Sequence, residues 1–315
     1  MAKPLGELGM WRIVDISENG RFLSLSHNSL VVSSDNVELG RISLSDIQSV
    51  IIHGHSAGIT IALSVALAEQ GIPLISCNSS HFPIAITLPV SNNFESAARI
   101  SAQAEASKAT LKRLWRDIIK TKVLSQVEVL ESINHSDAAN MRKLISTIKP
   151  GDPNNVEARA ARYYWQRLLG GDFRRNRELD GLNAHLNYGY TVIRAAMARS
   201  IVAAGLAPGL GIFHRNRLNA FQLIDDLMEP FRALIDQCVW SNRSVWTDKL
   251  TPDAKRELAS IITESLPTQS GVTSIPRVMS SLAISLSEVF SKQRKYLEWP
   301  QAWNTVAQQE LELVE

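Results

Sequence analysis

The spacing of apolar side chains changes once along this chain, near residue 92, and the change separates two kinds of expected element. Before it, short apolar runs alternate with turn residues, a pattern that predicts strands. The first four runs suggest a β-meander. The expected strands cover residues 11–16, 22–25, 29–32, 47–52, 73–76 and 84–88, and one helix covers residues 57–70.

After residue 92 the apolar positions recur at the three- and four-residue spacing of a helix. Between about Phe94 and Asn134 the chain contains no proline or glycine, so long helical structure is expected there. Helical spacing dominates to the end of the sequence. We therefore expect an α+β protein, with a small β-rich domain over residues 1–92 and a larger all-α domain over residues 93–315.

Two features of the helical part fix the places of acidic residues. Asp152 is a typical helix-capping residue, and the helix expected after it has Glu157 near its N-terminal end. Another helix is expected over residues 218–239, but Pro230 lies inside it, directly after Glu229. Since proline lacks a backbone donor and clashes with the preceding turn, we expect this helix to kink or break there.

Composition adds a modest electrostatic bias. The chain has 315 residues, 45% of them hydrophobic and 20% charged, which is ordinary for a globular protein. The net charge is only +2, but residues 1–90 carry four basic and seven acidic side chains, so the positive excess lies in the helical part. The two cysteines have no zinc or disulfide spacing, and the start has no signal-peptide core. We expect a cytoplasmic protein.

Three residues suggest chemistry: Glu157, His214 in a loop rich in glycine and proline, and Glu229. Two carboxylates and an imidazole can hold a divalent ion with positions left for substrate. This set suits Mg²⁺ or Mn²⁺, although ligand type alone does not exclude Zn²⁺. Eleven arginines and no lysine occur from Glu157 through Arg232, and guanidinium groups pair well with phosphate oxygens. The pattern favours metal-dependent chemistry on nucleic-acid phosphodiesters.

Each of these residues also has a purely structural interpretation. Glu157 can be a surface acid favoured by the helix dipole, and His214 an exposed or capping histidine. The acids near Pro230 can form a solvated face paired with Arg232. Without cations, however, acids so close together would repel one another. These acids are Asp225, Asp226 and Glu229.

Three longer segments carry a resemblance to a known family. They are Asn183–Tyr190 followed by Arg194, Gly205–His214, and Asp226–Arg232. In this order, after a small β-rich domain, they resemble the CRISPR-associated integrases, the endonucleases of spacer acquisition, over nearly the whole chain. The segment Met228–Arg232 most resembles the subfamily from type II systems. Phe213 departs from the pattern, since relatives often have a polar residue or histidine there.

The resemblance implies that Glu157, His214 and Glu229 are catalytic and bind Mg²⁺ or Mn²⁺. Asp226 is then either a group that supports a ligand or an alternate ligand. The resemblance also implies a homodimer, formed through the β-rich domain, that joins a small ferredoxin-like partner protein. Such an assembly inserts short fragments of double-stranded DNA into a CRISPR array, by attack of a 3′-hydroxyl on phosphodiesters of the repeat.

Basic residues are expected to contact the DNA. Arg159, Arg162 and Arg215 lie close in sequence to the expected metal ligands. Along the long helical region, basic residues at helical spacing suggest a stripe that follows a DNA backbone, or else a solvated face with scattered charge. This second set includes Arg99, Lys108, Lys112, Arg113, Lys120 and Lys122.

Two other functions are compatible with the sequence. A structure-specific nuclease acting on branched DNA would use the same metal site, with water in place of the 3′-hydroxyl. A non-catalytic DNA-binding scaffold would keep the fold without the chemistry, and the intact set of three ligands argues against it.

Overall fold

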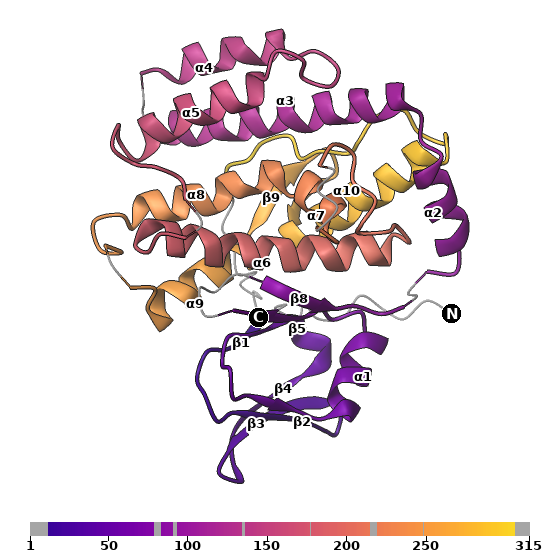
Figure 1. Ribbon diagram of the computed structural model, residues 1–315, viewed down its shortest axis with the longest axis vertical. Coiled ribbons are helices and arrows are strands. Elements are labelled where there is room, and N and C mark those ends of the chain that lie inside the picture. Colours follow the sequence, from indigo (N-terminus) through magenta and orange to yellow (C-terminus); the bar gives the residue numbers. More distant parts are fainter. Residues whose placement is uncertain are drawn as a thin grey trace, which may run out of the picture. The chain divides into compact units, whose positions relative to one another are not determined.

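The computed structural model describes residues 12–78, 83–90, 93–133, 136–176, 178–214, 219–247 and 249–305. The chain divides into two compact units, Met1–Val90 and Ser91–Glu315. Sheets build the first unit and mainly helices build the second, which confirms the expected α+β class (Figure 1). No helix in the described ranges is long and apolar enough to span a bilayer.

Two four-stranded sheets form the first unit, with the strand orders β1-β5-β7-β8 and β4-β3-β2-β6. Helix α1 (Ile61–Glu69) adds Leu63 and Leu67 to a core that both sheets share. The other elements are β1 (Arg12–Ile16), β2 (Phe22–Ser26), β3 (Ser29–Ser34), β4 (Val37–Ser43), η1 (Leu44–Asp46), β5 (Ile47–Ile52), β6 (Gly58–Ile59), β7 (Leu74–Cys77) and β8 (Pro83–Thr87).

The expectation of a β-meander is wrong for this unit. Strands β2, β3 and β4 are antiparallel neighbours, but β5 pairs in parallel with both β1 and β7. Five of the six residues of β5 are buried, as is usual for a strand between parallel neighbours. The apolar run marks the strand but not its partners, since strand order depends on contacts between distant segments. Strand β4 was not among the expected strands; most of it is exposed, and the apolar alternation that begins at Val37 and Leu39 is not kept to its end.

Helix α6 (Leu182–Ala203) forms the centre of the second unit, and 16 of its 22 residues are buried. It contacts α7, α8, α9 and α10, so its apolar surface is covered on several sides. Gly189 lets α8 approach, because a Cβ there would lie 2.4 Å from Ile235 Cγ2. The other helices are α2 (Ser96–Ala104), α3 (Lys108–Ser132), α4 (Ala138–Leu144), α5 (Val156–Leu168), α7 (Gln222–Leu227), α8 (Arg232–Ser241), α9 (Pro252–Ser260) and α10 (Ile275–Phe290).

Short elements connect these helices. The turns are η2 (Ile145–Thr147), η3 (Glu229–Phe231) and η4 (Ile261–Thr263). The expectation that this domain is all-α is wrong in one place, since β9 (Ser265–Thr268) and β10 (Gly271–Ser274) form a hairpin. The long helical region after Phe94 is two helices, because Ser107 caps α3 by accepting a hydrogen bond from Thr110 N–H. The expected break at Pro230 is confirmed: the 3₁₀ turn η3 separates α7 from α8.

Candidate active site

Glu157 lies in the first turn of α5, which begins at Val156, four residues after Asp152. The Asp152 carboxylate accepts hydrogen bonds from the N–H groups of Val156 and Glu157, both at 2.9 Å. These are first-turn donors that have no partner within the helix. Glu157 is thereby held in place, and its Oε1 lies 2.7 Å from the ammonium nitrogen of Lys122 on α3. Figure 1 shows α5 running beside α3.

Glu229 opens the turn η3, directly before Pro230. Its Oε2 lies 2.7 Å from Lys122 Nζ and its Oε1 lies 3.1 Å from Arg232 Nε. Burial alone would raise the pKa of Glu229, but Arg232 and Lys122 outweigh burial and lower it to about 2. The side chain is therefore ionised at neutral pH. Oxygen atoms of Glu157 and Glu229 thus converge on a single positive charge.

His214 ends a described stretch of loop that folds around Asp226 of α7. The Asp226 side chain is fully buried, and it accepts hydrogen bonds from the N–H groups of Ile212 at 2.6 Å and Phe213 at 2.9 Å. Gly211 makes this approach possible, since a Cβ there would lie 3.1 Å from Asp226 Oδ2 and 2.7 Å from the carbonyl oxygen of His214. The loop is therefore shaped by one buried carboxylate.

The imidazole of His214 is oriented by the same carboxylate. Its Nδ1 lies 2.5 Å from Asp226 Oδ1, so Nε2 is the ring nitrogen left for a metal ion or substrate. Metal-binding histidines are usually held in this way. The bond to Asp226 raises the pKa of His214, burial opposes the rise, and the charges of Glu229 and Glu157 add to it. The imidazole is therefore close enough to both glutamates to interact with them electrostatically.

Both glutamates of the candidate site contact the ammonium of Lys122. As the side chains stand, no three His, Cys, Asp or Glu residues of the described chain are grouped closely enough to hold an ion. The donor chemistry nevertheless fits a divalent cation, because Glu157 and Glu229 already share one positive charge and His214 is oriented through Nδ1. Asp226 orients His214 through Nδ1. Asp225 is not part of this arrangement, because its carboxylate lies 2.6 Å from the guanidinium of Arg194.

The residues expected to contact DNA have different surroundings. Arg159 and Arg162 are exposed on α5, the helix that carries Glu157, and Lys120 is half-buried on α3. Arg99 is tied to its own unit, through Glu95 Oε2 at 2.6 Å and the carbonyl oxygen of Ala204 at 2.9 Å. Arg215 lies outside the described residues.

The position of Lys122 does not fit the expected stripe of exposed basic residues. Its side chain is only 12% exposed and is paired with two carboxylates. Reversing its charge would therefore disturb Glu157 and Glu229 directly, so such a variant would not report on DNA contact alone.

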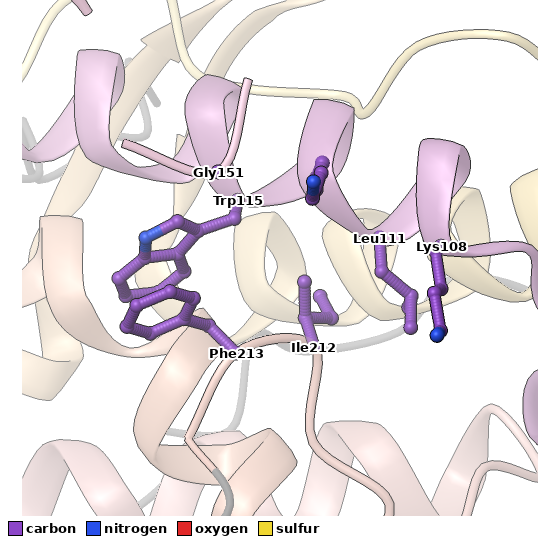
Figure 2. Close-up of a pocket in the computed structure, with 7 residues that line it drawn as sticks. Lys108, Leu111, Trp115, Gly151, Ile212 and Phe213 are labelled. Carbon is purple, nitrogen blue, oxygen red and sulfur yellow. The ribbon is translucent and has the colours of Figure 1, made fainter. Parts of the chain in front are cut away.

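A pocket of about 340 Å³ adjoins the His214 loop (Figure 2). Phe213 stacks on Trp115 with ring centroids 4.2 Å apart and planes 2° from parallel, and the edge of His214 meets Trp115 at 5.5 Å. Phe213 remains 44% exposed, while Trp115 is buried beneath it. Two lysines, Lys108 and Lys112, line the same pocket. A pocket lined by an exposed aromatic ring and by two lysines is suited to a nucleobase and its phosphates.

Comparison with known proteins places the chain in a family. Residues 14–258 match the family model described as CRISPR associated protein Cas1. The chain belongs to the Cas1 family. It is 35% identical over 295 residues to the CRISPR-associated endonuclease Cas1 of Neisseria meningitidis serogroup C (strain 8013), a match that covers 91% of this chain and 96% of that one. The expected family of CRISPR-associated endonucleases is confirmed.

Two solved structures are examples of proteins with the same fold. One, titled casposase bound to integration product, has a TM-score of 0.78 at 18% identity, covering 93% of this chain and 94% of that one. Another, from a structure titled Cas6-RT-Cas1–Cas2 complex, has a TM-score of 0.75 at 17% identity and covers 95% of this chain and 37% of that one. At these identities the likeness shows the fold alone.

Two features of the candidate site were not predicted from the sequence. Lys122 is 35 positions away from Glu157, and only the packing of α3 against α5 and η3 brings its ammonium between the carboxylates. The stack of Phe213 on Trp115 likewise joins residues distant in sequence. By contrast, the three-residue spacing of Glu229 and Arg232 suggested their pairing, although on a solvated face, whereas Glu229 is buried.

Proposed function

We propose that this protein is a metal-dependent DNA integrase of CRISPR adaptation, which inserts short DNA fragments into a CRISPR array. The observation that carries the proposal is the convergence of Glu157 and Glu229 on one cationic position, close to an imidazole that Asp226 orients. In a member of the Cas1 family, these two carboxylates and the imidazole can serve as ligands for a catalytic divalent ion.

In this proposal Glu157, Glu229 and Nε2 of His214 hold Mg²⁺ or Mn²⁺. When bound, such an ion lowers the pKa of an attacking hydroxyl or stabilises charge on the leaving oxygen of a phosphodiester. The chain's own residues prepare the site. Asp226 keeps the ring of His214 in one orientation, and the low pKa of Glu229 keeps its carboxylate charged.

The same unit offers groups for the DNA. Arg159 and Arg162 lie exposed on the helix of Glu157 and can pair with phosphate oxygens. The pocket of Phe213, Lys108 and Lys112 can accept a base and its phosphates next to the His214 loop. Lys120 and Arg99 remain predicted contacts, together with Arg215.

Assembly is also part of the proposal. We expect a cytoplasmic homodimer, formed through the β-rich domain of residues 1–92, that binds a small ferredoxin-like partner and double-stranded DNA. Support comes from proteins of the same fold, one of them in a structure named for a Cas1–Cas2 complex and another bound to an integration product. The segment Met228–Arg232 leads us to expect the type II subfamily.

Strand transfer tests this function. The full chain, with and without its small partner, is mixed with a short duplex bearing free 3′-hydroxyls, a supercoiled repeat plasmid and Mn²⁺ or Mg²⁺. We expect wild type to join the duplex to the plasmid and His214→Ala to fail. Equal joining by His214→Ala would mean that the active site lies elsewhere.

A nuclease acting on branched DNA is the second candidate, favoured by relatives that are named endonucleases. It would need the same metal ligands, with water as the nucleophile. A duplex with blocked 3′ ends separates the two functions. Cleavage of branched DNA without any joining would replace the integrase with the nuclease.

A further inference from the structure

Lys122 joins three elements of the helical unit at one point. It projects from α3, and its ammonium lies 2.7 Å from Glu157 at the start of α5 and 2.7 Å from Glu229 in η3. Lysine is rarely buried without an acidic partner, and this side chain is 12% exposed. The carboxylates of Glu157 and Glu229 therefore stabilise the buried ammonium of Lys122, and the ammonium in turn keeps the two carboxylates close together.

Both carboxylate oxygens of Glu229 are engaged, Oε2 by Lys122 and Oε1 by Arg232. A divalent ion that binds Glu229 must either displace one of these two cations or bind close to it and be repelled by its positive charge. The Arg232 guanidinium is also held over the ring of Tyr190, 4.6 Å from the centroid. Lys122 contacts both glutamates that are expected to bind the metal ion, so its departure frees an oxygen on each of them.

The lysine side chain has space into which it can move. Lys122 lines an open pocket of about 220 Å³, together with Arg175 and Tyr190. Its stem has four flexible carbons, so the ammonium can leave the carboxylates by rotation of side-chain bonds while α3 stays in place.

We propose that Lys122 is an internal counter-ion that holds Glu157 and Glu229 together in the metal-free protein and competes with the divalent ion for them. It is a positioning residue, since it acts on the ligands. The inference rests on the proposed function, because it takes both glutamates as metal ligands. Removing the ammonium then has two opposite effects: the carboxylates repel each other without metal, and the ion binds more tightly because it displaces no charge.

Titration with Mn²⁺ tests the competition, since the EPR signal of free Mn²⁺ is lost on binding. The variants are Lys122→Gln, Lys120→Gln as the matched loss of a lysine two positions earlier on α3, and Glu157→Gln as the loss of a ligand. We expect Lys122→Gln to bind Mn²⁺ at least about tenfold more tightly than wild type. Lys120→Gln should bind as wild type does, and Glu157→Gln should bind weakly.

Thermal unfolding covers the case in which Lys122→Gln is unstable. Its unfolding temperature should be lower than that of wild type in EDTA, and the rise on adding Mn²⁺ should be larger. If Lys122→Gln binds Mn²⁺ no more tightly than wild type while Glu157→Gln loses binding, the counter-ion role is overturned and the metal site stands. If Glu157→Gln binds as wild type does, the metal site itself is misplaced, and strand transfer then tests the function separately.

Discussion

At the scale of single residues, Asp226 illustrates how one buried carboxylate can shape a site that it does not itself complete. It accepts hydrogen bonds from the backbone N–H groups of three loop residues, and its Oδ1 lies 2.5 Å from Nδ1 of His214. The adjacent Asp225 faces Arg194 and Asn219 instead. Asp225 and Asp226 therefore carry the same charge in different surroundings, so each can serve as the control for mutation of the other.

Asp226→Asn should lower strand-transfer activity by about 10- to 100-fold, because the imidazole loses the negative charge that fixes its orientation and basicity. Asp225→Asn, which removes the same charge one position earlier, should have a much smaller effect on activity. The measurement is the initial rate of joining at saturating Mn²⁺. Similar losses in the two variants would mean that Asp226 acts on the stability of the fold and has no special relation to His214.

Phe213 is the exposed half of an aromatic stack and lines the pocket of Figure 2. Phe213→Leu should weaken binding of single-stranded DNA by about 1–3 kcal/mol, the usual value of a base stacked on an aromatic ring. Phe213→Tyr should bind as wild type does. Fluorescence anisotropy of a labelled oligonucleotide gives both affinities, and equal binding by the leucine and tyrosine variants would exclude stacking at this residue.

At the scale of elements, Pro230 links local sequence to the geometry of the site. It lies in η3 between α7 and α8, and its ring prevents a continuous helix. Pro230→Ala should allow the two helices to join and move Glu229 away from Glu157. We expect weaker Mn²⁺ binding with unchanged or greater helical content by circular dichroism. Pro252→Ala, at the start of α9, is the control and should leave Mn²⁺ affinity unchanged.

The sequence predicts such local features well and long-range pairings poorly. Strand β5 and the break at Pro230 could be predicted, since each depends on residues close together in the chain. The parallel pairing of β5 with β1 could not be predicted, because the sequence of neither strand specifies which strand it pairs with. The same holds at the site: Glu157, His214 and Glu229 could be chosen as candidates from their contexts, whereas the place of Lys122 depends on how α3 packs.

The contact between α6 and α8 contains a buried acid, Asp236, that accepts a hydrogen bond from the hydroxyl of Tyr190. Burial raises the pKa of Asp236 from 3.8 to about 7, against the lowering effect of Tyr190. A folded-state pKa above the unfolded value means that the folded protein binds the proton more tightly. This contribution to stability is complete below pH about 4 and is lost as pH rises through about 7.

Asp236→Asn should therefore flatten the pH dependence of unfolding. Relative to wild type, the variant should gain a few kcal/mol in the free energy of unfolding between pH 5 and pH 8, since asparagine keeps a hydrogen-bonding group without ionising. Urea unfolding followed by circular dichroism at the two pH values measures this difference. A constant difference between wild type and variant would show that Asp236 does not titrate in this range.

At the scale of the whole molecule, the small net charge of +2 hides an uneven distribution. Residues 1–90 are acidic on balance, and the positive excess lies in the unit that carries the candidate active site. Long-range attraction of DNA should therefore be weak at physiological salt, where charges are screened beyond about 8 Å. Affinity would then depend on a few close phosphate contacts near the site.

Charge reversal of two exposed arginines tests this view. Arg159→Glu combined with Arg162→Glu removes both exposed guanidinium groups on the helix of Glu157. Removing one ion pair with a phosphate should reduce the slope of log affinity against log salt by about 0.9 for duplex DNA, so we expect a reduction of nearly two. Titrations from low to physiological salt supply the slope. The control reverses Arg243 and Arg256, exposed residues outside α5, with the same change in net charge. An equal reduction of slope in this control would mean that bulk charge, and no set of phosphate-binding groups on α5, governs the binding of DNA.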